Sequence, residues 1–257
     1  MKKTLFILTI ILLAAGVLLF AQNAHFTTSG TVEFNKTVNM YAQIQKEITK
    51  ENEEWTQPAF DAYKKNHQQF LTAKSTLNFA GGKELFIPVK SDNPTGGFFD
   101  APMAGQNNTV YTDFADGQST VQKQVFEQTY LVKDTIRKIK WKITEETRVI
   151  AGYNCHRANG LVLDSVYVVA FYTDEIHVSG GPESFNGLPG MILGIALPHD
   201  NITWFATKVE LIEPTTAQLT TVQKGKKVTW GQLQSELQKS FKDWGKEAEK
   251  RLWIYSL

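Results

Sequence analysis

The sequence of 257 residues holds few side chains whose types and spacing are suited to chemistry. Cys155 and His156 are neighbours, as a nucleophile and its base would need to be in space. On a strand, however, adjacent side chains point to opposite faces, so these two cannot act on one another. We therefore expect Cys155 to be a buried, inert thiol.

A second set of polar residues flanks a glycine-rich loop. Its carboxylates and imidazoles are ligand types that metal ions accept, but their spacing matches no dense pattern such as His-Glu-x-x-His. We therefore predict no metal ligand and no cofactor. The alternative is a metal-assisted hydrolase acting at the Asp174–Asp200 loop region. The residues of this alternative are Asp174, Glu175, His177, His199 and Asp200.

The loop between these polar residues constrains the backbone more than it offers chemistry. Leu188-Pro189-Gly190-Met191 is typical of a type II turn, with glycine accepting a positive φ. Phe185 and Leu188 are its large apolar side chains, and we expect them to attach the loop to the core. The candidate motif loop comprises Gly181, Pro182, Phe185, Gly187, Leu188, Pro189 and Gly190.

The first 21 residues have the features of a secretory signal. Lys2 and Lys3 precede an apolar run that ends near Ala21, a small residue at the predicted cleavage site. We therefore predict export to the periplasm or cell envelope, and the signal is either cleaved or kept as an anchor. Cys155 is the only cysteine, which excludes a lipid-modified cysteine after the signal and an intramolecular disulfide.

The remainder, residues 22–257, is expected to form a single domain. No low-complexity linker divides it, and its size suits one β-rich domain. Loss of Lys2 and Lys3 changes the formal net charge from +1 to −1. This balance argues against nucleic acid as a partner, because nucleic-acid binding requires a concentrated basic face.

Hydrophobic periodicity predicts strands with a helical segment near each end. After a first strand at 31–35, the period from Val38 to about Lys74 is helical, with an interruption at Pro58. A long glycine- and proline-rich loop is expected at 92–108. A single amphipathic helix is predicted at 228–252, opened by a capping box of Thr229 and Gln232.

Turn residues mark several hairpins between these helical segments. They lie at Gly81-Gly82, Asp116-Gly117, Ala151-Gly152 and 198–201, and a strand apolar on both faces spans 165–173. For the last hairpin, a register with Leu197 opposite Ile202 places Gly194 opposite Phe205. We expect the phenyl ring to cover that glycine.

Several stretches resemble the GLPGLI family of exported bacterial proteins. The resemblance rests on Gly187-Leu188-Pro189-Gly190-Met191-Ile192-Leu193, on 172–176, on 150–158 and on 203–210. It implies export and a β-rich fold, and it carries no catalytic residue or cofactor. We predict an α+β, β-rich fold with a curved antiparallel sheet and helices packed on one face, similar to the half-barrels of lipoprotein carriers.

These expectations favour a non-enzymatic binding or accessory protein of the periplasm or cell envelope. Trp141, Phe171 and Trp204 are the predicted ligand lining. An apolar ligand or a cell-envelope protein is the predicted partner, and no membrane span is expected once the signal is cleaved.

Overall fold

The computed structural model describes residues 27–90 and 107–257. The predicted signal at 1–21 lies outside the described residues, as does most of the predicted loop at 92–108.

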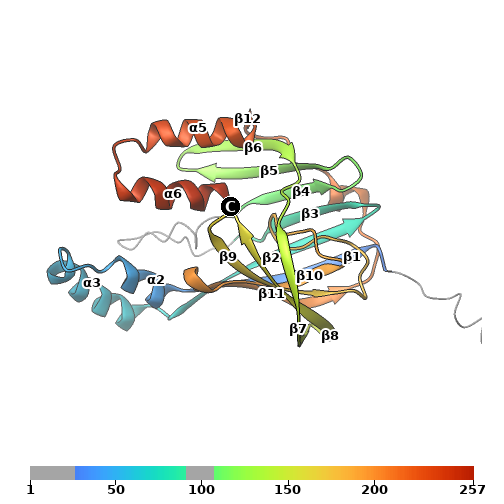
Figure 1. Cartoon of the computed structure of the whole chain (residues 1–257), viewed down its shortest axis with the longest axis horizontal. Coiled ribbons are helices and arrows are strands. Elements are labelled where there is room, and N and C mark those ends of the chain that lie inside the picture. The colour runs from blue at the N-terminus through green and yellow to red at the C-terminus, as the bar shows by residue number, and fades with distance from the viewer. Residues whose placement is uncertain (1–26, 91–106) are drawn as a thin grey trace, which may run out of the picture.

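One twelve-stranded sheet dominates the described chain (Figure 1). Its order is β12-β6-β5-β4-β3-β2-β1-β11-β10-β9-β8-β7, antiparallel throughout except that β12 runs parallel to β6. The β-rich α+β fold is therefore confirmed. The strands are β1 (Gly30–Asn39), β2 (Phe70–Ala80), β3 (Lys83–Pro88), β4 (Thr109–Asp113), β5 (Gln118–Val125), β6 (Gln128–Thr135), β7 (Lys140–Ile150), β8 (Tyr153–Val162), β9 (Val166–Thr173), β10 (Met191–Leu197), β11 (Ile202–Glu210) and β12 (Lys226–Val228).

Strand register carries an apolar row across half of the sheet. Val32 of β1 lies opposite Leu77, which lies opposite Phe86, and the row continues through Val110, Val121 and Val132 to Val228. All seven side chains are buried. Because alternate residues of a strand share one face, this row defines the inner face of the sheet.

The first two helices differ from the prediction. β1 continues to Asn39, and α2 (Met40–Glu47) and α3 (Glu53–Asn66) follow, so that β2 already begins at Phe70. Pro58 lies within α3, and the helix continues through it rather than being interrupted there. Figure 1 shows this helix pair at one end of the molecule, beyond the strands.

The predicted C-terminal helix is two helices, and here the prediction was wrong. α5 (Trp230–Ser240) ends at Phe241, and α6 (Lys246–Ser256) begins after Gly245, which has a φ of 58°. That left-handed backbone favours glycine and reverses the chain. The capping box of Thr229 and Gln232 is confirmed.

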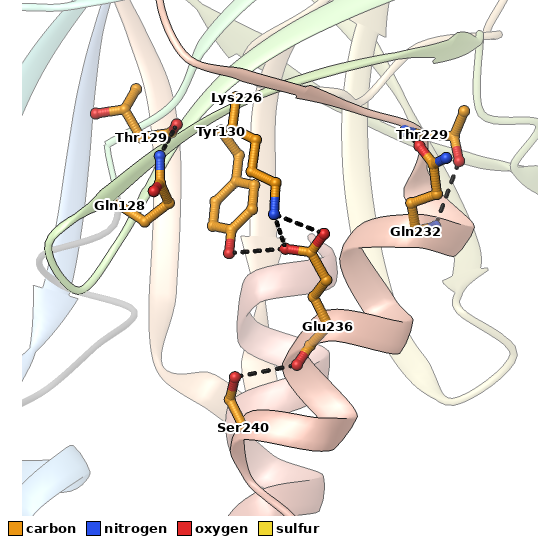
Figure 2. Close-up of polar contacts among 8 residues, drawn as sticks. All are labelled: Gln128, Thr129, Tyr130, Lys226, Thr229, Gln232, Glu236 and Ser240. Carbon is orange, nitrogen blue, oxygen red and sulfur yellow. Dashed lines mark hydrogen bonds and ion pairs between the residues drawn. The ribbon is translucent and has the colours of Figure 1, made fainter.

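α5 is held against β6 and β12 by a small polar cluster (Figure 2). Glu236 accepts hydrogen bonds from Lys226 Nζ at 2.8 Å and from the Tyr130 hydroxyl at 3.2 Å. The middle of α5 is thereby held against the inner face of the sheet.

Two 3-10 turns complete the structure: η1 (Pro198–Asp200) joins β10 to β11, and η2 (Thr216–Leu219) precedes β12. Four predicted chain reversals are confirmed, at Gly81-Gly82, Asp116-Gly117, Ala151-Gly152 and η1. The register of Gly194 with Phe205 and of Leu197 with Ile202 is also confirmed.

In the part of the chain that the structure describes, no helix has the length and apolar character to cross a membrane.

Candidate functional site

The candidate motif loop between β9 and β10 crosses the inner face of the sheet. Backbone hydrogen bonds fold it on itself, from Gly187 N to Ser179 O at 3.0 Å and from Ile192 N to Gly180 O at 2.9 Å. Phe185 and Leu188 are 5% and 1% exposed, so the predicted attachment of the loop to the core is confirmed. Buried as they are, these two side chains are part of the core.

Gly190 does not adopt the positive φ that a type II turn requires, so that prediction was wrong. The left-handed residues of the loop are Glu183, with a φ of 56°, and Gly187, with a φ of 91°. Gly190 is required for a different reason, because a Cβ built there would lie 2.0 Å from the carbonyl oxygen of Thr173. The constraint is close packing of two backbones.

Charged side chains project from the inner face of the sheet toward this loop. Lys36 of β1 and Lys123 of β5 are 5% and 0% exposed, and both lie near the carboxylate of Glu183. Glu183, itself 8% exposed, accepts a hydrogen bond from Asn108 Nδ2 at 3.0 Å. We call Lys36, Asn108, Lys123 and Glu183 the buried polar cluster.

Burial favours the uncharged forms of the ionisable side chains in this cluster. Burial lowers the pKa of Lys36 to about 8 and that of Lys123 to about 7, with the Glu183 carboxylate opposing both shifts. Burial also raises the pKa of Glu183, against the charge of Lys36 and the hydrogen bond from Asn108. A carboxyl group and amines with pKa values displaced toward neutral pH are suited to proton transfer.

A second buried carboxyl group contacts the loop at Gly180 and Gly181. Glu84 of β3 is 2% exposed and accepts a hydrogen bond from Gly181 N at 3.3 Å. Burial raises the pKa of Glu84 to about 8. A Cβ at Gly180 would lie 2.0 Å from Glu84 Oε2, so a glycine there lets the loop pass over the carboxyl group.

A small cavity adjoins the buried polar cluster. It has a volume of about 20 Å³ and is bounded by Lys36, Asn108, Glu183 and Trp204, with α6 residues covering it. That volume is enough for about one water molecule. Trp204 Nε1 and Lys123 Nζ are both buried without a hydrogen-bond partner within the described residues, so this region has unused donors.

A much larger open cleft lies beyond the loop, and we call it the C-terminal cleft. Its volume is about 1310 Å³. Its walls are the end of β6 with the β6–β7 connection, at 134–139, and the β8–β9 turn at 163–165. The loop residues Asn186 and Gly187, the start of α5 and one side of α6 complete them. The same loop therefore contributes to both the small cavity and the cleft.

The structure brings two of the three predicted lining residues to the loop. Trp141 Nε1 donates a hydrogen bond to Asn186 O at 2.9 Å, and Trp204 packs against Phe185 with ring centroids 6.1 Å apart. Phe171 lies on the opposite face of the sheet, where its ring is 6.3 Å from that of Phe205. The three side chains therefore do not face a common space, and a ligand-lining role for them stays a prediction.

The polar residues of the hydrolase alternative are separated by a strand. Thr173, next to Asp174, pairs with Met191 at one end of β10, whereas His199 and Asp200 follow Leu197 at the other end. Six residues of extended chain span roughly 20 Å. Within the described ranges, no three histidine, cysteine or acidic residues gather as metal ligands would. Cys155 is fully buried, as expected, and burial raises the pKa of its thiol to about 11.

Residues 104–231 match the family model described as "N-glycanase peptide, N-terminal domain" of the PNGase F-II type. The matched segment is slightly less than half of the chain. It includes β4 to β12, the motif loop and Trp230 at the start of α5. A comparison with curated proteins found no match.

Solved structures of PNGF-II show a similar fold. In one crystal form the TM-score is 0.50 and the identity 15%, over 79% of this chain and 31% of that chain. A second crystal form gives a TM-score of 0.48 and 18% identity, over 78% of this chain and 32% of the other. An uncharacterized conserved protein from Thermus thermophilus gives a TM-score of 0.39 and 7% identity, over 84% of this chain and 98% of that chain. This chain thus spans about a third of the length of PNGF-II.

Two predictions are overturned by these findings. The resemblance to the GLPGLI family was wrong, because the family model that matches the same region is that of an N-glycanase domain. The short glycine-proline motif specifies a backbone shape, which is weak support for a family. The prediction of a non-enzymatic binding or accessory protein was also wrong, since the family model that matches is that of the N-terminal domain of an N-glycanase. The hydrolase alternative agrees better with that match.

The buried polar cluster was missed at the sequence level, although a signal for part of it exists. Val32, Phe34, Lys36 and Val38 alternate along β1, and Val121, Lys123 and Val125 alternate along β5. Alternation places each lysine on the same face as its apolar neighbours. Asn108 and Glu183 give no such signal, because they belong to loops.

Proposed function

We propose that this chain works as an N-glycanase-type hydrolase that removes N-linked glycans from peptides or proteins. The reaction adds water across the amide bond that joins the glycan to asparagine. The match of residues 104–231 to an N-glycanase domain carries the proposal. The fold shared with PNGF-II supports it, and because the chain spans only about a third of PNGF-II, the activity is a proposal for this chain.

The buried polar cluster is our candidate for the proton transfers of this reaction. Amide hydrolysis needs a base that activates water and an acid that protonates the departing nitrogen. Glu183 lies beside a cavity with room for about one water molecule, and Lys36 and Lys123 supply amines with lowered pKa values. We assign water activation to Glu183 and positioning of its carboxylate to Asn108.

The setting of this activity is part of the proposal. We propose that residues 22–257 form one domain, exported to the periplasm or cell envelope by the signal at 1–21. One continuous sheet from β7 to β12 supports the single domain. We further propose that the sheet curves as in the half-barrels of lipoprotein carriers, with the motif loop in its concavity. In this proposal the ligand is an N-linked glycan, in place of the apolar ligand predicted from the sequence.

Deglycosylation of a defined glycopeptide by the purified full chain tests the proposal. We expect glycan release by the wild type, and at least about a tenfold loss for Glu183→Gln, because a neutral amide is a poor base. Glu210→Gln is the matched control, since Glu210 forms an exposed ion pair with Lys208 on β11, away from the cluster and the cleft. Equal rates for Glu183→Gln and the wild type would exclude the assigned role, and absence of release by the wild type would exclude the function.

A further inference from the structure

The C-terminal cleft combines aromatic rings with a balanced set of charges. Trp230 and Trp253 are partly exposed on its walls. Its charged lining residues are two bases, Arg137 and Lys138, and three acids, Asp134, Asp164 and Glu249. Such a mixture selects neither a strongly anionic nor a strongly cationic ligand.

The geometry points to a saccharide-binding site in this cleft, with Trp253 as a stacking platform and Asp164 as a hydrogen-bond acceptor for sugar hydroxyls. Aromatic rings pack against the apolar faces of ligands, while a few placed polar groups fix their orientation. The volume of about 1310 Å³ exceeds that of a typical small-molecule pocket, so it has room for several sugar rings. The inference deepens the proposed function by naming where the glycan binds.

Trp230 has a structural role in the cleft, unlike Trp253. Its ring is 5.2 Å from the guanidinium of Arg137 and 5.5 Å from Lys123 Nζ. Its backbone N–H donates to Asp134 Oδ2 at 3.0 Å, and Arg137 also donates to the backbone oxygen of Ser256. These contacts lock the β6–β7 connection to both C-terminal helices and hold the cleft in one shape before a ligand arrives.

The β8–β9 turn gives independent support. Leu163 and Asp164 have φ values of 53° and 58°, and the turn closes with a hydrogen bond from Ser165 N to Val162 O at 3.3 Å. Two consecutive left-handed residues define a type I′ turn, which favours Asn-Gly. Gly81-Gly82 follows that preference, whereas Ala151-Gly152 follows it only at its second position, and Phe126 is a further left-handed residue outside the cleft.

At the cleft, by contrast, the first position of the turn is a leucine, which the left-handed region disfavours, whereas Asp164 is of a type that this region accepts. A leucine in the left-handed region carries backbone strain, and such strain gathers at functional sites. Here it places Leu163 and Asp164 on the wall of the cleft. The strain at Leu163 is thus consistent with a binding role for this wall of the cleft.

A binding titration tests the inference with the purified full chain. The probes are N,N′-diacetylchitobiose and a free high-mannose N-glycan, followed by calorimetry and tryptophan fluorescence. We expect saturable binding by the wild type and a loss of about tenfold or more in affinity for Trp253→Ala, as removal of an aromatic contact predicts. Trp55→Ala is the control, since Trp55 is 60% exposed on α3 and is not part of the cleft.

A second comparison separates function from folding. The double variant Leu163→Asn, Asp164→Gly should raise the melting temperature while weakening saccharide binding, because it relieves strain and removes the acceptor. Ala151→Asn makes the equivalent change at the β7–β8 turn and should leave the affinity unchanged. A destabilised fold is thereby excluded as the cause of weaker binding.

The outcomes distinguish this inference from the proposed function. Saturable glycan binding without hydrolysis would support the cleft and contradict the proposed activity. Hydrolysis with an affinity unaffected by Trp253→Ala and by the turn variant would contradict the cleft. The inference is also overturned if the unglycosylated peptide competes as well as the glycan, because the cleft would then bind peptide.

Discussion

At the level of single residues, the core of this protein is unusual because it contains several buried ionisable side chains. Glu84, Lys36, Lys123 and Glu183 all lie on or against the inner face of the sheet with less than a tenth of their surface exposed. A buried charge is costly unless it is paired or neutralised. Their displaced pKa values therefore have consequences for stability as well as for chemistry.

Glu84 should make the protein less stable as the pH rises. Its pKa is about 8 in the folded chain and 4.5 in the unfolded reference, so the folded state holds more protons between these values. Stability from this group is present below about pH 4.5 and falls until about pH 8. Glu84→Gln should remove that fall and stabilise the protein at about pH 9 by on the order of a few kcal/mol.

Urea unfolding across the pH range measures this effect. At about pH 4 the wild type and Glu84→Gln should have similar stability, because the wild-type carboxyl group is then protonated in both states. A constant difference between the two proteins at every pH would show that Glu84 is ionised in the folded chain.

Lys123 should have the opposite dependence. Its pKa is about 7 in the folded chain and 10.5 in the unfolded reference, so the unfolded state holds more protons in this window and stability rises with pH. Lys123→Met should stabilise the protein by on the order of a few kcal/mol at about pH 6, and by much less at about pH 10. Thermal unfolding of the wild type and of Lys123→Met at these two pH values measures the difference. If Lys123→Met is less stable than the wild type at both, the ammonium group of Lys123 is well paired in the folded chain.

At the scale of elements, the loop between β9 and β10 is held by close backbone packing. Gly190 leaves no room for a Cβ beside the Thr173 carbonyl, and Gly181 leaves none beside the Phe185 carbonyl, where the distance would be 2.7 Å. The glycines thus let the loop pack closely against these backbone segments, with Glu183 near the two lysines.

Gly190→Ala should therefore destabilise the protein, by roughly 1–3 kcal/mol or more, as overpacking in a core does. Gly231→Ala is the matched control, because a Cβ there meets nothing within 4 Å in the first turn of α5. The control should be neutral or stabilising by up to about 1 kcal/mol. Denaturant midpoints compare the two, and a harmless Gly190→Ala would contradict the packing described here.

Local sequence patterns predicted much of the fold. The features that they did not predict depend on contacts between residues far apart in the sequence. The hairpins and the register of Gly194 with Phe205 follow from turn residues and alternation within a few positions. The parallel pairing of β12 with β6 joins residues far apart in the sequence, and the reversal at Gly245 depends on packing of α6. The polar cluster likewise joins Lys36, Lys123 and Glu183, which only the folded sheet brings together.

At the scale of the whole molecule, one sheet supports two adjoining polar spaces. The motif loop separates the small cavity at Glu183 from the C-terminal cleft, and α6 contributes to both. Figure 1 shows α5 and α6 side by side at the β6 end of the sheet, with the C-terminus at the end of α6. A glycan in the cleft would contact one side of the loop, at Asn186 and Gly187, while the Glu183 carboxylate lies on the other side, so hydrolysis by Glu183 requires the loop to move.

Hydrolysis of a glycopeptide in water enriched in heavy oxygen tests the central claim most directly. Mass spectrometry of the peptide product reports both the bond cleaved and the origin of the new oxygen. We predict complete glycan removal, with the glycosylated asparagine converted to aspartate that carries the heavy oxygen. An unchanged glycopeptide, or an asparagine that keeps its first sugar, would contradict the claim that this chain hydrolyses the glycan–asparagine amide.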